Sequence, residues 1–430
     1  MDLNALYESM RNCECGCKHE CDLKAFELGS GILLNTGKIL KENGFSKRLL
    51  MVADGNSFRV TKGLYESLLE DGFVVELRVY DDMRVADQRE VDELRPQIRR
   101  VDGVLSVGTG SVNDICRYAS FLEDKPLAIV ATAPSMDGFA SDSAPITKDG
   151  FKASQPCRQP VAIIADTKIL AQSPNELKSA GFGDVMAKFI ALVDWRVANI
   201  LHGDYYCERV ATLVRDALKR MVSLADKVTT DSEEAASAVM ETLVMTGIAM
   251  QLAKCTRPAS GTEHIISHFW ECKKLEKGII SDFHGKKVAV ATLVVTDIYH
   301  KLASIPSVKA QKENIDWKAL EKAYGKNLLV DVEKFNLPHS IVDEIDPSLI
   351  EKNWQRICEI IKEEMPTLDE MIRIYDLAGA AKTNAEIAVD DDLADEGITY
   401  HVYMRRRVTL MRLLPMLNLD ALQIYKSDKK

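Results

Sequence analysis

The chain has 430 residues, of which 46% are hydrophobic and 28% charged, a composition typical of a globular protein with room for two or three domains. The net charge of −10 and the pI near 5.5 disfavour a general nucleic-acid binder, which would carry a basic surface. Since no apolar run is long enough to span a bilayer and Met1 is not followed by a signal-peptide pattern, we expect a cytoplasmic protein without nucleic-acid or membrane partners.

Four of the ten cysteines fall in the N-terminal segment Cys13–Cys21, together with His19. Several thiols beside one imidazole could hold a structural zinc ion. An exposed, flexible terminal segment is the alternative, because the spacing C-x-C-x-C matches no standard zinc finger. The other six cysteines are scattered singly and are expected to be small core residues in a reducing compartment. Residues 1–24 are therefore treated as a separate cysteine-rich segment.

From residue 25 to about 170, short apolar runs alternate with helical patterns. A helix is expected at 25–43. Buried strands are predicted at 49–53, 73–80, 103–107, 127–131 and 161–165, with helices up to 69, at 85–99 and at 112–121. This alternation is typical of a Rossmann-like parallel sheet with helices on both faces, so we expect an α/β dinucleotide-binding domain at 25–170. In such sheets ligands bind at the carboxyl ends of the strands.

Beyond Pro174 the patterns become helical, which predicts an all-helical domain at 171–430. Helices are expected at 176–190, 205–227, 232–255, 262–274, 286–302, 347–362, 367–375 and 403–414. The last one should carry Arg405–Arg407 near its start, and Asp390–Asp392 should form a solvated loop. We expect a cofactor and a metal ion to meet in the cleft between the two domains.

Two polar segments follow predicted strands of the first domain. The run GTGSVND (residues 108–114) follows one strand and opens a helix, where glycines and free N–H groups could bind a pyrophosphate. An ordinary strand-to-helix turn is the alternative, because the run lacks the third glycine of the G-x-G-x-x-G fingerprint. After the next strand, hydroxyl side chains at 132–141 could bind a nicotinamide or ribose, and Asp137 could bind a substrate hydroxyl. Here a polar turn is the alternative.

Three histidines suggest a metal site in the second domain. His264 and His268 stand four residues apart and share a helix face, and His284 follows twenty residues after His264. Asp184 offers the carboxylate that would complete a two-histidine site. Lys188, one turn later, could neutralise a substrate phosphate. Core or surface histidines on an amphipathic helix and a surface Asp–Lys pair are the alternatives.

Five segments resemble the sn-glycerol-1-phosphate dehydrogenases: GTGSVND (108–114), APSMDGFAS (133–141), GFGDVMAK (181–188), RPASGTEHIISHFWE (257–271) and FHGKKVAVAT (283–292). That family belongs to a superfamily with the iron-containing alcohol dehydrogenases, glycerol dehydrogenases and dehydroquinate synthases, and the resemblance implies a dehydroquinate synthase-like fold. Two positions depart from the family pattern: Thr109 interrupts a run of three glycines, and Arg117 replaces a lysine.

The resemblance also implies the roles of individual residues. As metal ligands it implies Asp184, His264 and His284. As substrate-binding or catalytic residues it implies Asp137 and His268. The metal ligand Asp184 would also contact the substrate, and Lys188 is our own candidate for binding its phosphate. As dinucleotide-binding residues it implies Asp54, Gly110, Ser111, Val112, Asn113, Asp114, Thr132, Ala133, Pro134, Ser135 and Ser141. Arg257 and Arg405–Arg407 are further candidates for the substrate phosphate.

The expected activity is the reversible reduction of dihydroxyacetone phosphate to sn-glycerol 1-phosphate by NADH or NADPH. It would need one divalent ion, with zinc first and nickel or iron(II) as alternatives, since two nitrogens and one carboxylate discriminate poorly among them. A glycerol or polyol dehydrogenase and a dehydroquinate-synthase-like lyase remain open as alternatives. We expect a small-molecule substrate and a homo-oligomeric enzyme.

Overall fold

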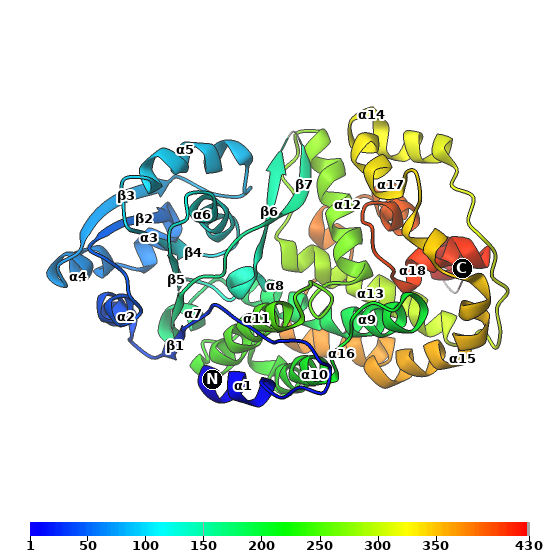
Figure 1. Cartoon of the computed structure of the whole chain (residues 1–430), viewed down its shortest axis with the longest axis horizontal. Helices are drawn as coiled ribbons and strands as arrows, with labels where there is room; N and C mark the ends of the chain where they lie inside the picture. Colours follow the sequence, from blue (N-terminus) through cyan, green and yellow to red (C-terminus); the bar gives the residue numbers. More distant parts are fainter. Residues whose placement is uncertain (149, 428–430) are drawn as a thin grey trace. The chain divides into compact units, whose positions relative to one another are not determined.

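The computed structural model describes residues 1–148 and 150–427, and its helices and strands are labelled in Figure 1. Contacts along the chain divide it into two compact units. Unit 1 comprises Met1–Val185, Arg209–Cys255 and Leu377–Gly379. Unit 2 comprises Met186–Glu208, Thr256–Asp376 and Ala380–Lys430. The sequence-based division placed breaks after residues 24 and 170, whereas each unit here combines several separate segments of the chain. The difference arises because the helix at Glu233–Ala253 (α11) packs on elements of unit 1.

A six-stranded parallel sheet forms the centre of unit 1 and confirms the predicted α/β fold. Its strands lie in the order β1-β8-β5-β4-β2-β3. Their bounds are Ala25–Gly29 (β1), Arg48–Asp54 (β2), Val74–Tyr80 (β3), Gly103–Gly108 (β4), Leu127–Ala131 (β5) and Ala162–Asp166 (β8). The chain runs from β2 outward to β3 and then returns to β4 on the other side of β2. The carboxyl ends of β2 and β4 therefore flank the point where the strand order reverses, which is where such sheets bind ligands.

Helices cover both faces of this sheet. Alternate residues of a strand point to opposite faces. Leu105 and Val107 of β4 belong to the same buried cluster as residues of α2 (Thr36–Glu42) and α4 (Leu64–Glu70). Ser106, between them, donates a hydrogen bond to Asn113 of α6 (Gly110–Leu122), which lies on the other face beside α5 (Gln88–Ile98).

Two parts of unit 1 differ from the sequence-based prediction. The helix expected at 25–43 is wrong over its first residues, because Ala25–Gly29 pairs in parallel with β8 as an edge strand. Only the later part is helical, in η1 (Leu33–Asn35) and α2. An antiparallel hairpin of β6 (Ser143–Lys148) and β7 (Phe151–Pro156) was not predicted.

Unit 1 contains further helices, which precede, connect or follow the strands of the sheet in the sequence. They are α1 (Leu3–Met10), α3 (Gly55–Val60), α7 (Thr167–Ala171), α8 (Asn175–Met186), α10 (Glu208–Val222), α11 (Glu233–Ala253), η2 (Gly138–Ala140) and η3 (Ala225–Lys227). Only α11, among the described residues, is long and apolar enough to cross a membrane. However, 78% of its apolar window is buried inside the structure, as in the core helix of a folded domain.

Unit 2 is built from helices throughout its described residues. The longer ones are α9 (Lys188–His202), α12 (Thr262–Glu276), α13 (His284–Leu302), α14 (Trp317–Asn336), α15 (Pro347–Glu364) and α16 (Leu368–Ala378), whose last residues belong to unit 1. The shorter ones are α17 (Asp391–Tyr400), α18 (Leu410–Leu413), α19 (Ala421–Lys426), η4 (Ile341–Glu344), η5 (Ala385–Ile387), η6 (His401–Tyr403) and η7 (Leu414–Leu417). The all-helical prediction holds, although α14, α17, α19 and most of α9 were not predicted.

Two local predictions in unit 2 are wrong. Asp390–Asp392 does not form a loop, because Asp390 caps α17 by accepting the backbone N–H of Leu393 and the next two aspartates occupy the first turn. Acidic groups there are favoured by the helix dipole. The expected helix at 403–414 is also wrong over most of its length, since only Leu410–Leu413 (α18) is α-helical within it. Arg405–Arg407 lie in a non-helical segment between η6 and α18.

Candidate active site

The predicted dinucleotide segments meet at the carboxyl edge of the sheet in unit 1. Gly110 opens α6 with φ +48°, a left-handed conformation that favours glycine, and a Cβ added there would point into open space. Thr109, just before it, lies 2.6 Å from the hydroxyl of Ser135 after β5. This contact joins the phosphate-loop candidate to the 132–135 segment. An anionic group could approach the N-terminus of α6 at this point.

Asp54 ends β2 beside this edge, and its carboxylate has a structural task. One oxygen accepts the backbone N–H of Ser57 at 2.8 Å, and the Ser57 hydroxyl completes a capping box at the start of α3. Both hydrogen bonds from Ser57 go to Oδ1 of Asp54, so the cap does not use Oδ2. Asp54 can therefore serve a ribose only with the part of its carboxylate that the cap does not use.

Arg117, which replaces the family's usual lysine, is completely buried in unit 1. Its guanidinium donates to Asp114 at 2.6 Å and to the carbonyl oxygens of Ser141 and Ser143 at 3.0 and 2.9 Å. Asp114 and Ser141 are both predicted cofactor residues. The buried arginine therefore connects the phosphate-loop helix to the segment after η2.

The 132–137 segment packs tightly against α8, which carries Asp184. A Cβ on Gly181 would lie 1.8 Å from the carbonyl oxygen of Pro134, so no side chain fits at this position. One turn further along, the buried carboxylate of Asp184 accepts the backbone N–H of Asp137 at 2.9 Å. Unit 1 thus places the predicted metal ligand Asp184 directly beside the predicted substrate residue Asp137.

The three predicted histidines lie together in unit 2. The ring centroids are 5.3 Å apart for His264 and His284, 6.3 Å for His264 and His268, and 5.6 Å for His268 and His284. His264 is buried, whereas His268 and His284 are partly exposed. His264 and His268 come from α12, and His284 is the first residue of α13. Imidazoles so close together can share a divalent ion.

Glu263 orients His264 and was not predicted as a site residue. Its buried carboxylate lies 2.7 Å from Nδ1 of His264, and the same oxygen accepts the N–H of Gly261 at 2.8 Å. A carboxylate there favours the tautomer in which Nδ1 carries the hydrogen and Nε2 keeps its lone pair. Carboxylate–histidine pairs of this kind orient metal ligands in many proteins. The only sign of this role in the sequence is that Glu263 directly precedes His264.

A second buried carboxylate, Asp194 of α9, caps α12. It accepts the N–H of Thr262 at 2.8 Å, the hydroxyl of Tyr299 at 2.6 Å and the N–H of Leu410 at 2.8 Å. Burial raises the pKa of Asp194 to about 6, against the opposing hydrogen bond from Tyr299. A Cβ on Gly261 would lie 2.7 Å from Asp194 Oδ2, so glycine is needed between the two carboxylates.

The cationic candidates for the substrate phosphate differ from expectation. Lys188 does not continue the helix of Asp184, because α8 ends at Met186 and α9 begins at Lys188 after the cap residue Ala187. The argument from one-turn spacing is therefore wrong. Nor is Lys188 part of a surface pair, since it is only 1% exposed.

The arginine candidates are engaged within unit 2. Arg257 pairs with Asp204, and Arg406 pairs with Glu344. Arg407 donates to the carbonyl oxygen of Ser260 at 2.8 Å. These contacts hold the 404–409 segment against the loop before α12. They make Arg257, Arg406 and Arg407 less suitable for a phosphate than the sequence suggested.

The chain is similar to known proteins of one enzyme family. The family model described as iron-containing alcohol dehydrogenase matches residues 27–174. A protein of Halalkalibacterium halodurans named glycerol-1-phosphate dehydrogenase (NAD(P)+) is 30% identical over 409 residues, covering 94% of this chain and 95% of that protein. A protein of the same name from Methanothrix thermoacetophila is 34% identical over 269 residues, covering 62% of this chain and 74% of that protein.

Solved structures show the same fold at low sequence identity. A probable glycerol dehydrogenase from Sinorhizobium meliloti has a TM-score of 0.61 at 15% identity, covering 94% of this chain and 98% of that chain. Glycerol dehydrogenase from Schizosaccharomyces pombe has a TM-score of 0.56 at 18% identity, covering 85% of this chain and 95% of that chain.

Proposed function

The chain belongs to the glycerol-1-phosphate dehydrogenase family within the iron-containing alcohol dehydrogenases, and on this premise we propose that it reduces dihydroxyacetone phosphate to sn-glycerol 1-phosphate. The reductant would be NADH or NADPH, and the reaction would be reversible. The observation that supports this proposal best is the group of three histidines in unit 2, one of which is oriented by a buried carboxylate.

We propose that Asp184, His264 and His284 hold one divalent ion. One carboxylate oxygen and two imidazole nitrogens are suitable donors for such an ion. In unit 2 the carboxylate of Glu263 favours the tautomer of His264 in which Nδ1 carries the hydrogen. When bound, such an ion acts as a Lewis acid that polarises a carbonyl group. Zinc, nickel and iron(II) all suit these donors, and zinc is the first choice.

The remaining groups would bind the substrate and move a proton. Asp137, whose backbone is tied to the Asp184 carboxylate, would accept a hydrogen bond from the substrate hydroxyl. His268 lies beside the other two imidazoles but is more exposed than His264. We propose that it donates a proton to the oxygen that becomes the product hydroxyl. Lys188 would neutralise the phosphate. The dinucleotide would supply the hydride from the carboxyl edge of the sheet.

Two alternatives share this scaffold, a glycerol or polyol dehydrogenase and a dehydroquinate-synthase-like lyase. An assay of NADH oxidation on metal-reconstituted protein, with dihydroxyacetone phosphate beside dihydroxyacetone, separates them. We expect oxidation with the phosphorylated substrate and little with the other. Equal rates would favour the polyol dehydrogenase. A lyase regenerates its cofactor in each turnover, so the absence of net NADH consumption with either substrate would contradict the proposed reduction.

A further inference from the structure

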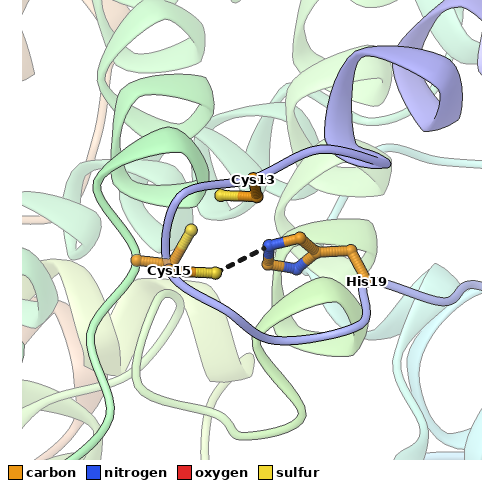
Figure 2. Close-up of side chains that lie close together, drawn as sticks. Cys13, Cys15 and His19 are labelled. Carbon is orange, nitrogen blue, oxygen red and sulfur yellow. Dashed lines mark hydrogen bonds between the residues drawn. The ribbon is translucent and has the colours of Figure 1, made fainter.

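A second cluster of metal-ligating side chains lies in the N-terminal segment, apart from the histidines of unit 2. The chain between α1 and β1 has almost no regular secondary structure. Within it, Cys13, Cys15 and His19 point toward one another (Figure 2). One ligand atom from each of them lies within 4.8 Å of the others. Two thiols and one imidazole are donors that zinc prefers.

The hydrogen bonds of His19 favour the tautomer in which Nε2 can bind a metal. Nδ1 lies 2.6 Å from the carbonyl oxygen of Leu252 in α11. A carbonyl oxygen only accepts, so Nδ1 must carry the hydrogen and Nε2 must keep its lone pair. That lone pair faces Cys15 Sγ at 3.2 Å (Figure 2). A backbone carbonyl that fixes the tautomer in this way is a common partner of metal-bound histidines.

The other two cysteines of the segment do not join this cluster. Cys21 donates its S–H to the side-chain oxygen of Gln159 at 3.1 Å and accepts the Tyr7 hydroxyl at 3.0 Å, so it acts as a protonated thiol. Cys17 is exposed. The segment therefore separates its thiols into two that face the imidazole, one that is hydrogen-bonded elsewhere and one on the surface.

We propose that Cys13, Cys15 and His19 bind a structural zinc ion distinct from the proposed catalytic ion. The ion would hold the irregular N-terminal segment in place, where little secondary structure does so. The inference does not depend on the proposed reaction, since none of these three residues has a role in it.

Cobalt substitution tests this site separately from the other, because only a thiolate ligand gives an intense near-ultraviolet charge-transfer band with cobalt(II). We expect the band in the wild-type protein and in His264→Ala. Cys15→Ser and His19→Ala should lose it, together with one of about two zinc equivalents measured by elemental analysis. Cys17→Ser is a matched control in the same segment and should keep the charge-transfer band and the full zinc content.

Several results would overturn the proposal. One is a wild-type protein with a single zinc equivalent and no thiolate band. Another is a disulfide between Cys13 and Cys15 in non-reducing peptide mass analysis. A third is a Cys17→Ser variant that loses the band as Cys15→Ser does. If Cys15→Ser does not fold, the bands and zinc contents of wild type and His264→Ala still decide.

Discussion

The backbone N–H of Asp137 donates to Oδ2 of Asp184 at 2.9 Å, which ties a proposed substrate residue to a proposed metal ligand. One oxygen of the carboxylate is thereby held in place by the backbone of the loop after β5. The loop and α8 approach each other at Gly181, where no side chain fits. The position of the Asp184 carboxylate therefore depends on the same loop that carries the proposed cofactor residues.

Substitution of the proposed catalytic ligands should remove one metal equivalent and the activity together. We expect this for Asp184→Asn, His264→Ala and His284→Ala, because two remaining ligands bind a divalent ion poorly. His268→Ala should keep the metal and bind NADH, yet lose turnover by roughly 10²–10⁴-fold, as for a missing proton-transfer group. Elemental analysis beside steady-state kinetics checks both. A metal-depleted His268→Ala protein, or full metal content in Asp184→Asn, would contradict the assignment.

Loss of the carboxylate that orients His264 should weaken metal binding without abolishing it. For Glu263→Gln we expect a decrease in metal affinity of roughly 10–100-fold, the range typical of such supporting groups. Glu276→Gln, at the other end of α12, is the matched control and should bind metal normally. Competition with a chelator of known affinity measures the difference. Equal affinities in the two variants would show that Glu263 does not act through His264.

Gly110→Val should abolish NADH binding while the protein stays folded. The β-branched side chain would occupy the open space at the start of α6, where a pyrophosphate meets the backbone. It also strains a residue with φ +48°. Gly72→Val is the control, since Gly72 has φ +84° and similarly open surroundings at a turn before β3. NADH fluorescence titration with circular dichroism distinguishes loss of the site from loss of stability.

Lys188→Ala should raise KM for dihydroxyacetone phosphate far more than KM for dihydroxyacetone. The buried ammonium would neutralise a substrate phosphate, and only the phosphorylated substrate can lose that contact. Steady-state kinetics with both substrates measures the effect. If KM rises equally for the two, Lys188 has a structural role instead.

Protonation of His401 should destabilise the protein in acid. Burial lowers its pKa to about 4, and Nδ1 donates to the carbonyl oxygen of Gly397 at 2.8 Å in the neutral form. Because the folded-state pKa is below the usual 6.5, the stabilisation is complete above pH 6.5 and is lost as pH falls toward 4. The full loss is about 3 kcal/mol. Denaturation of wild type and His401→Gln from pH 7.5 to 4.5 measures it; parallel curves would refute it.

Buried strands were the most predictable part of the fold. The strands at 49–53, 103–107, 127–131 and 161–165 were found because their continuous apolar runs are covered on both faces. The edge strand Ala25–Gly29 was missed, since only its first two residues are buried. The β6–β7 hairpin was also missed, since its strands are short and each contains a proline, a residue that argues against a strand. Local pattern carries little signal where pairing with a distant strand decides the structure.

The site was predictable where chemistry follows helical spacing. His264 and His268 were found from their separation by four residues. Asp184 was a candidate because its carboxylate suits a site with two histidines, and the resemblance to a family then implied it as a metal ligand. Asp194 was not found, because its contact with Thr262 joins residues 68 positions apart. Such supporting contacts depend on tertiary packing and leave no local pattern.

The close approach of Gly181 to Pro134 has a thermodynamic consequence. A loop and a helix in backbone contact move together, so a shift of the 132–135 segment on dinucleotide binding would reach Asp184 one turn away. Dinucleotide and ion affinities are then linked, and each ligand changes the affinity of the other by the same factor. We therefore expect the order in which the two are added to affect how fast the ternary complex forms, but not its final stability.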